Sequence, residues 1–162
     1  MTDKRSAGLL LFRRHGGGAD GDGPGVEVLL GHMGGPYWQH KEARAWSIPK
    51  GEYGPDEHPR DAARREFTEE IGLPAPDGPY VPLGEVRQSN GKLVTVWAVE
   101  ADLDPALMVP GTFTLEWPPG SGRTAQFPEL DRVAWCTPEV ARTRLNTAQV
   151  AFVERLLAHL HG

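Results

Sequence analysis

Three glutamates, Glu66, Glu69 and Glu70, form the clearest chemical pattern in the chain. In an α-helix, positions spaced i, i+3 and i+4 lie on one face, and here Phe67 and Ile71 lie on an adjacent apolar face. Carboxylates at this spacing repel one another by about 0.2–0.5 kcal/mol per pair, and a divalent cation among them would relieve that repulsion. Oxygen ligands without His or Cys favour Mg²⁺ or Mn²⁺. The triplet by itself predicts either a metal site or a solvated acidic helix face.

The residues around the triplet decide between these two interpretations. The segment from 51 to 73 follows Gly-x5-Glu-x7-Arg-Glu-U-x-Glu-Glu-x-Gly-U, where U is apolar, with its fixed positions at Gly51, Glu57, Arg65, Glu66, Glu69, Glu70 and Gly72. Seven fixed residues at roughly 6% background each coincide by chance at about one starting point in a billion. The segment resembles the Nudix box, with Phe67 at an apolar position that is more often aliphatic. The order of expected strands and helices around it also resembles that family.

The resemblance implies an α/β fold, a Nudix α/β/α sandwich with a mixed sheet. It implies hydrolysis of nucleoside diphosphates linked to another moiety, by attack of water at phosphorus with Mg²⁺ or Mn²⁺ bound. Carried over by position, Glu69 and Glu70 are the expected core metal ligands, and Glu66 is a third ligand or the general base. Arg65 is expected to orient a box carboxylate through its planar fork. Glu57 either reaches a second metal or forms a salt bridge with Arg65, and we favour the salt bridge.

Further ligands come from outside the helix in this resemblance. The backbone carbonyl of Lys50 occupies the place that supplies an extra metal ligand in relatives. Family members often add an acidic ligand beyond the box, and Glu129 is the first candidate because it shortly precedes an expected strand ending in Trp135. Glu116 is the second candidate, and either could be a surface carboxylate. The two box glycines are expected to be conformational, allowing a tight turn at Gly51 and a helix stop at Gly72.

The sequence identifies the substrate less specifically than it identifies the box. The segment Trp46-Ser-Ile-Pro-Lys50-Gly51 resembles the Trp-x-x-Pro-Lys-Gly segment of diadenosine tetraphosphate hydrolases and of some related nucleoside triphosphatases. The Lys50 cation could neutralise a long polyphosphate. His32, Lys41 and Arg13 lie on or near strands that would border the cleft, and each is either a phosphate contact or an ordinary surface residue.

Tyr37, Trp38 and Trp117 could stack on a base or belong to the core. The resulting prediction is a Mg²⁺-dependent Nudix pyrophosphohydrolase acting on nucleoside polyphosphates, with dinucleoside polyphosphates first. Nucleotide sugars, dinucleotides and oxidised nucleoside triphosphates are the alternative substrates. A ligand-sensing Nudix scaffold without turnover is the alternative of another class, and the complete set of charged box residues argues against it.

The elements that position these residues follow from the pattern of turns and apolar runs. A helix is expected from Pro59 to Gly72, where proline suits the first turn and glycine the end. Asn90-Gly91 predicts a two-residue hairpin. The expected strands are Gly8–Arg13, Val26–Leu30, Trp46–Pro49, Leu83–Gln88, Lys92–Glu100 and Phe127–Trp135.

The remaining segments are a loop and two closing helices. The glycine-rich stretch between Gly16 and Gly25 is expected to be a loop and not a phosphate-binding P-loop. One closing helix is expected after Thr137-Pro138. Asn146 with Gln149 could cap the last helix, whose apolar stripe is expected in the core and consists of Val150, Val153, Leu157 and Leu160.

Composition limits the partners. The 162 residues fit one domain spanning 1–162, and 17 basic against 22 acidic residues give a net charge of -5. Segment 51–73 contains seven of the acids and three of the bases. The charge disfavours long nucleic acids and anionic membranes, whereas bound divalent ions would make the acidic segment a receptor for small nucleotides. The single cysteine, Cys136, and the lack of a long apolar run agree with a cytoplasmic protein.

Overall fold

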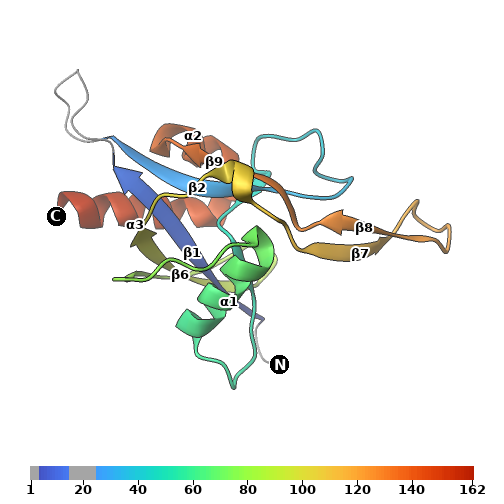
Figure 1. Cartoon of the computed structure of the whole chain (residues 1–162), viewed down its shortest axis with the longest axis horizontal. Helices are drawn as coiled ribbons and strands as arrows, with labels where there is room; N and C mark the ends of the chain where they lie inside the picture. Colours follow the sequence, from blue (N-terminus) through green and yellow to red (C-terminus); the bar gives the residue numbers. More distant parts are fainter. Residues whose placement is uncertain (1–3, 15–24) are drawn as a thin grey trace.

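A mixed β-sheet forms the centre of the protein (Figure 1). The computed structural model describes residues 4–14 and 25–162, so the glycine-rich stretch lies almost entirely outside the described residues. Within them the sheet has seven strands, and β1 pairs in parallel with β6 but antiparallel with β2 and β4. The strands are β1 (Arg5–Arg14), β2 (Val26–Met33), β3 (Trp46–Ser47), β4 (Lys50–Glu52), β5 (Val81–Arg87), β6 (Leu93–Glu100) and β9 (Leu130–Cys136).

Helices cover both faces of this sheet. Leu10 and Phe12 of β1 contribute to one core cluster, together with residues of α2 (Pro138–Arg144) and α3 (Val150–His161). Leu9 and Leu11 of the same strand contribute to a second cluster, which contains the apolar face of α1 (Pro59–Ile71). Successive side chains of a strand point to opposite faces, so a continuous apolar run such as that of β1 is buried on both sides. The chain therefore has the predicted α/β fold with a mixed sheet.

Helix α1 begins and ends at the predicted residues. His58 caps its N-terminus by accepting the N–H of Arg60 at 3.1 Å, and Pro59 occupies the first turn. Gly72 ends the helix with φ 78°, and its N–H donates to the carbonyl of Thr68. A left-handed residue at this position turns the chain away from the helix axis.

Replacing Gly72 with alanine should destabilise the protein. A Cβ at Gly72 would lie 2.3 Å from the carbonyl oxygen of Val109, and the positive φ adds backbone strain. We expect the free energy of unfolding to fall by about 1–3 kcal/mol, measured by denaturant titration.

Two control variants separate the causes of that loss. Gly91→Ala has the positive φ but open space around the Cβ, so it should lose less stability than Gly72→Ala. Gly54→Ala has open space and no positive φ, so it should lose none. Equal stability of the Gly72 and Gly54 variants would contradict the assignment.

The hairpin between β5 and β6 has a longer loop than predicted. Gln88 donates its N–H to the carbonyl of Lys92 at 2.9 Å, which leaves Ser89, Asn90 and Gly91 in the loop. Gly91 has φ 87° and donates to the carbonyl of Gln88, as in a turn followed by a glycine bulge. The two-residue prediction is wrong because this glycine forms the bulge after the turn.

The expected strand 127–135 is two strands that belong to different sheets. At Glu129 the backbone leaves the ladder: its N–H donates to Gly111 and its carbonyl accepts from Gly34. Before this point β8 (Thr124–Pro128) pairs with β7 (Thr112–Glu116), and after it β9 pairs with β2. The β7–β8 hairpin extends away from the main sheet (Figure 1), and no such hairpin was expected from the sequence.

The C-terminal segment follows the prediction in part. Val153 is buried, and the other three residues of the predicted stripe are partly buried against the same cluster. Asn146 caps a short 3₁₀ turn, Thr147–Gln149, and not α3 itself. The capping role expected for Gln149 is wrong because its amide turns into the interior. No helix in the described ranges is long and apolar enough to span a membrane.

Candidate active site

Arg65 on α1 holds three box carboxylates together. Its guanidinium donates two hydrogen bonds to Glu57, at 2.9 and 2.8 Å, so the predicted Glu57–Arg65 ion pair is present. One further nitrogen, Nη1, donates to Glu66 at 2.8 Å and to Glu69 at 3.1 Å. Because the guanidinium fork is planar and rigid, these bonds fix the directions in which the carboxylates point.

Gly51 on β4 lies against the buried carboxyl group of Glu66. A Cβ at Gly51 would lie 1.9 Å from Glu66 Oε2 and 2.0 Å from its Cδ. Gly51 pairs with Ala7 within the sheet and shows no left-handed φ. Our expectation of a tight turn is therefore wrong, because the close approach of Glu66 is what requires glycine.

Glu70, Glu129 and Lys50 line one cavity of about 250 Å³, which also reaches Trp38 and Phe113. Burial raises the pKa of Glu70 to about 8, and the charges of Glu129 and Glu66 add to this although the Lys50 ammonium opposes it. Burial likewise lowers the pKa of Lys50, with a contribution from the nearby Lys92 ammonium. The structure thus brings Glu129 to the acidic face of α1.

The carboxylates of this cluster repel one another. Burial raises the pKa of Glu66, and the charges of Glu69 and Glu129 add to the rise despite the hydrogen bond from Arg65. Burial also raises the pKa of Glu129, with a contribution from Glu69. Such a donor set fits a hard divalent cation, whose charge would offset the repulsion.

The carboxylates of the box and of Glu129 do not converge on a single metal-binding position. In the described part of the chain, no three His, Cys, Asp or Glu side chains stand close enough together to hold a metal ion. Glu66 and Glu69 instead contact Arg65. Ligation by the box residues stays a prediction.

The raised pKa of Glu70 predicts that metal-free protein loses stability as pH rises from about 4.5 to about 8. In this window the folded state retains a proton that the unfolded state releases, so folding becomes less favourable as pH rises. Glu57 does not contribute there, because Arg65 lowers its pKa below 4.5. Thermal unfolding in EDTA at several pH values measures the effect. Glu70→Gln should flatten the profile, and an equally steep profile in this variant would contradict the assignment.

His32 lies in the interior and not at the cleft surface. Its side chain is fully buried, with Nδ1 2.9 Å from Asp131 Oδ1 and Nε2 2.6 Å from the carbonyl oxygen of Lys41. Both ring nitrogens thus face acceptor oxygens within the protein. The ring also packs edge-on against Trp46. His32 supports the segment around Lys41 and is not placed to contact a phosphate.

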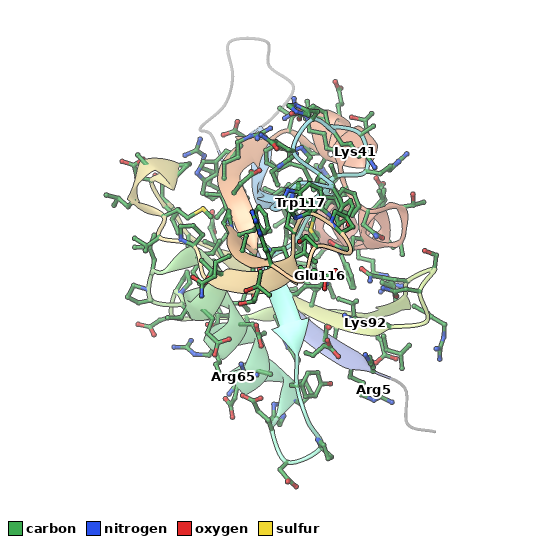
Figure 2. The ribbon with its side chains drawn as sticks, turned by 90° about the vertical axis from the view of Figure 1, so that its right-hand side faces the viewer. Arg5, Lys41, Arg65, Lys92, Glu116 and Trp117 are labelled. Atoms are coloured by element: carbon green, nitrogen blue, oxygen red, sulfur yellow. The ribbon has the colours of Figure 1, made fainter. Side chains whose placement is uncertain are left out.

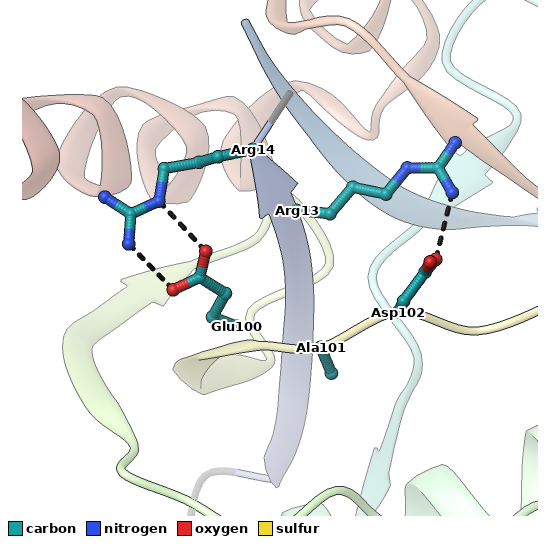
Figure 3. A pocket seen from close by; sticks show the side chains of 5 residues that line it. All are labelled: Arg13, Arg14, Glu100, Ala101 and Asp102. Atoms are coloured by element: carbon teal, nitrogen blue, oxygen red, sulfur yellow. Dashed lines mark hydrogen bonds and ion pairs between the residues drawn. The ribbon is translucent and has the colours of Figure 1, made fainter. Parts of the chain in front are cut away.

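Arg13 lies far from the box glutamates. Lys50 pairs with Gly8 of β1, and Arg13 is five residues further along the strand, roughly 17 Å away. There Arg13 pairs with Asp102 at 3.0 Å, next to the Arg14–Glu100 pair (Figure 3). The expectation that Arg13 borders the cleft is not supported by this position.

Lys41 and the aromatic candidates lie nearer to the cleft. Trp38 lines the cavity, and the exposed Lys41 has its Nζ 5.4 Å from the centre of the Trp38 ring. Tyr37 packs edge-on against Trp117, which also contacts Phe127. Trp38 is thus the one of the three candidates that lines the cavity.

Glu116 has a local partner in the β7–β8 hairpin. It accepts the N–H of Gly120 at 2.6 Å and does not line the cavity of Glu70. Figure 2 shows it beside Trp117. Of the two acidic candidates outside the box, only Glu129 approaches the box carboxylates in the described residues.

A second cavity, of about 220 Å³, adjoins the first and shares Trp38, Ser47 and Lys50 with it. Its other polar residues were not expected in the cleft from the sequence, and they include Gln88, Lys92, Asn146 and Gln149. The only available signal was the position of Lys92 directly after Asn90-Gly91 in a predicted hairpin.

The chain belongs to the Nudix family. The family model described as NUDIX domain matches residues 2–156. With the fold and the box residues described above, this makes the protein a hydrolase acting on phosphoanhydride bonds, in a family that generally uses divalent metal cations.

The individual relatives match this chain at modest sequence identity or over only part of its length. The CTP pyrophosphohydrolase of Escherichia coli is 28% identical over 121 residues, which cover 74% of this chain and 76% of that one. The RNA pyrophosphohydrolase of Pseudomonas putida is 40% identical over 60 residues, which cover 36% and 38% of the two chains. A Caenorhabditis elegans Ap4A hydrolase, solved as a binary complex, has a TM-score of 0.61 and 20% identity over 98% of both chains. At this identity the structural likeness shows the fold alone.

Proposed function

We propose that the protein hydrolyses a phosphoanhydride bond in soluble nucleoside polyphosphates at the cavity of Glu70, Glu129 and Lys50. The observation that carries this proposal is the meeting of the acidic face of α1 with one half-buried lysine in a single cavity. Carboxylates suit a divalent cation, and the ammonium group suits the remaining phosphate charge. A cytoplasmic location is part of the same proposal.

The metal in this proposal is Mg²⁺ or Mn²⁺, held by Glu66, Glu69, Glu70 and Glu129 with the carbonyl of Lys50. When bound, it would polarise a phosphoryl oxygen and offset the charge of the polyphosphate. Arg65 is the positioning residue, because its hydrogen bonds to Glu66 and Glu69 set where these carboxylates point.

Proton transfer is the second task of the site. Glu66 is either a third ligand or the base that takes a proton from the attacking water. Its burial beside Gly51 shields it from bulk solvent, and burial raises its pKa, which favours proton acceptance. Glu57 has a structural role in this mechanism, since both of its oxygens are engaged by Arg65.

Dinucleoside polyphosphates are the first candidate substrates. The Trp46–Gly51 segment supports them, because it resembles the corresponding segment of diadenosine tetraphosphate hydrolases. Lys50, which lies at the end of this segment, faces Glu70 and would meet the phosphate chain.

Nucleoside triphosphates are the second candidate class. The relation to a CTP pyrophosphohydrolase over 121 residues favours them. Nucleotide sugars and dinucleotides are the remaining alternatives for an enzyme.

A substrate panel tests the proposal. Purified protein with Mg²⁺ should hydrolyse at least one member of a set containing dinucleoside tetraphosphates, nucleoside triphosphates, nucleotide sugars and dinucleotides. Separation of the products by chromatography shows which phosphorus is attacked. Cleavage of a nucleotide sugar but no dinucleoside polyphosphate would overturn the first candidate. No cleavage of any compound would favour the ligand-sensing alternative.

Glu129 and Glu116 offer a matched pair for the additional acidic ligand. We expect Glu129→Gln to lower kcat/KM by about tenfold or more, because it removes a carboxylate from the cavity of Glu70. Glu116→Gln makes the same chemical change on the β7–β8 hairpin, where the side chain bonds Gly120, and should leave kcat/KM within about twofold. The reverse order of effects would assign the role to Glu116.

A further inference from the structure

The buried side chain of His32 lies close to two elements that line the cavity of Glu70. One is the segment after β2, which contributes Trp38 to the lining. The other is the start of β9, which contributes Leu130, with Glu129 directly before it. His32 belongs to β2 and its exposed fraction is 0%. Any effect of His32 on a reaction in this cavity must therefore pass through these two elements.

The ring of His32 is bonded to both elements. Nδ1 lies 2.9 and 3.0 Å from the two carboxylate oxygens of Asp131, the second residue of β9. Nε2 lies 2.6 Å from the backbone carbonyl oxygen of Lys41, three residues after Trp38. A carboxylate and a carbonyl oxygen can only accept, so each ring nitrogen needs a hydrogen to bond its partner. A ring with two N–H groups is an imidazolium, and it forms an ion pair with Asp131.

A second carboxylate near the ring makes a different kind of link. Glu42 accepts the indole N–H of Trp46 at 3.1 Å and forms an ion pair with Arg132 of β9 at 2.6 Å. The hydrogen bond from Trp46 lowers the pKa of Glu42, and the charges of Arg132, Arg144 and His32 add to this. The Glu42–Arg132 pair is about half exposed, so water and salt weaken it. The bonds of the buried His32 ring are protected from this competition.

Turns within the segment connect the Lys41 carbonyl to the position of Trp38. Trp38 donates its N–H to the carbonyl of Gly35 at 3.2 Å, and Lys41 donates its N–H to the carbonyl of Trp38 at 3.0 Å. Fixing Lys41 therefore fixes where Trp38 stands in the cavity lining. Glu129 is fixed separately, because its backbone N–H and carbonyl are bonded to two glycines. Loss of the His32 bonds should thus displace Trp38 more than Glu129.

We propose that His32, as an imidazolium, is a positioning residue for substrate binding, because it links Lys41 to Asp131 and so holds Trp38 in the cavity lining. A neutral imidazole has one N–H and keeps only one of the two bonds. His32 acts through Trp38 and does not touch the substrate. This inference rests on the proposed function for its substrate, whereas the two bonds of the ring exist in the protein without substrate.

Steady-state kinetics with the substrate identified by the panel test the positioning role. His32→Phe keeps a ring against Trp46 but removes both donors, so KM should rise by about tenfold while kcat stays within about threefold. In a Trp38→Ala background the same change should alter KM by less than about twofold, because the side chain that His32 positions is then absent. A role confined to folding would lower the Tm and leave the KM of the folded enzyme unchanged.

Asp131→Asn and Glu42→Gln are a matched pair, since each removes one carboxylate charge near the ring. Asp131→Asn removes the charge that assists the bond to Nδ1 and should raise KM by about fivefold. Glu42→Gln breaks the exposed ion pair with Arg132 but keeps an acceptor for Trp46, and should leave KM within about twofold. Thermal unfolding shows whether each variant is folded. Folded His32→Phe and Asp131→Asn variants with the native KM would overturn the proposal.

NMR gives a readout that does not depend on turnover. At neutral pH both ring nitrogens of His32 should be protonated, and the indole N–H signal of Trp38 should shift in His32→Phe but not in Glu42→Gln. A single protonated nitrogen, or an unshifted Trp38 signal, would overturn the proposal. Both expected signals in a protein that cleaves no member of the panel would refute the proposed hydrolysis and leave the positioning of Trp38 by His32 standing. Turnover with the native KM in His32→Phe would do the reverse.

Discussion

Glu70→Gln should lower turnover by at least about a hundredfold while the protein remains folded. Glu70 lies on the buried side of α1, beside Lys50 and within reach of the charges of Glu66 and Glu129. Glutamine keeps the shape of the side chain but removes the charge that would attract a divalent cation. The measurement is kcat with the substrate identified by the panel, at several Mg²⁺ concentrations.

A second readout does not depend on turnover. Mg²⁺ should raise the Tm of the native protein, because an ion that binds only the folded state stabilises it, and this rise should be smaller in Glu70→Gln. Without metal, the variant should be more stable than the native protein near pH 8, because it no longer buries an ionising carboxyl group. Glu139→Gln, on the exposed start of α2, is the control and should change neither quantity. Full activity of Glu70→Gln would refute the metal-site assignment.

Gly51→Ala should lower kcat by about tenfold to a hundredfold. The added methyl group would occupy the place of the Glu66 carboxyl group, 1.9 Å from Oε2, so Glu66 must move. Its hydrogen bond to Arg65 is then lost or redirected, and Arg65 also positions Glu69. A displacement of about 1 Å at a reacting group is enough for an effect of this size.

The control for Gly51→Ala lies three residues further along the same segment. Gly54 has open space around it, so Gly54→Ala introduces the same methyl group without a contact. It should retain kcat within about twofold. If Gly51→Ala is folded and fully active, Glu66 has no role that depends on its position.

Local patterns in the sequence were sufficient for much of the fold. Helix α1 has the predicted bounds because proline, the apolar positions and Gly72 all act within a few residues of one another. The β5–β6 hairpin is present for the same reason, although its loop is longer. The β7–β8 hairpin could not be recognised, because the break between β8 and β9 arises from backbone bonds of Glu129 to the distant Gly34 and Gly111.

In the site, too, some features follow from local sequence patterns and others from contacts between distant residues. Spacing on one helix was enough to group Glu66, Glu69 and Glu70, and the ion pair between Arg65 and Glu57 could be predicted within one segment. The burial of His32 could not be predicted, because it depends on Asp131 and on the segment after β2, which approach it only in the folded chain. The surroundings of Arg13 likewise depend on Asp102, far along the sequence.

The sequence by itself determined the family, the acidic helix face and the kind of chemistry, since these depend on residue types at short fixed spacings. Only the tertiary structure decided which distant residues complete the cleft: Glu129 beside Glu70, and Lys92 with Gln88 beyond Lys50. It also shows why residue 51 must be glycine: the carboxyl group of Glu66, which belongs to α1, occupies the space that a side chain at residue 51 would need. Such contacts join residues whose separation along the chain carries no periodic signal, so they exist only once the sheet has been assembled.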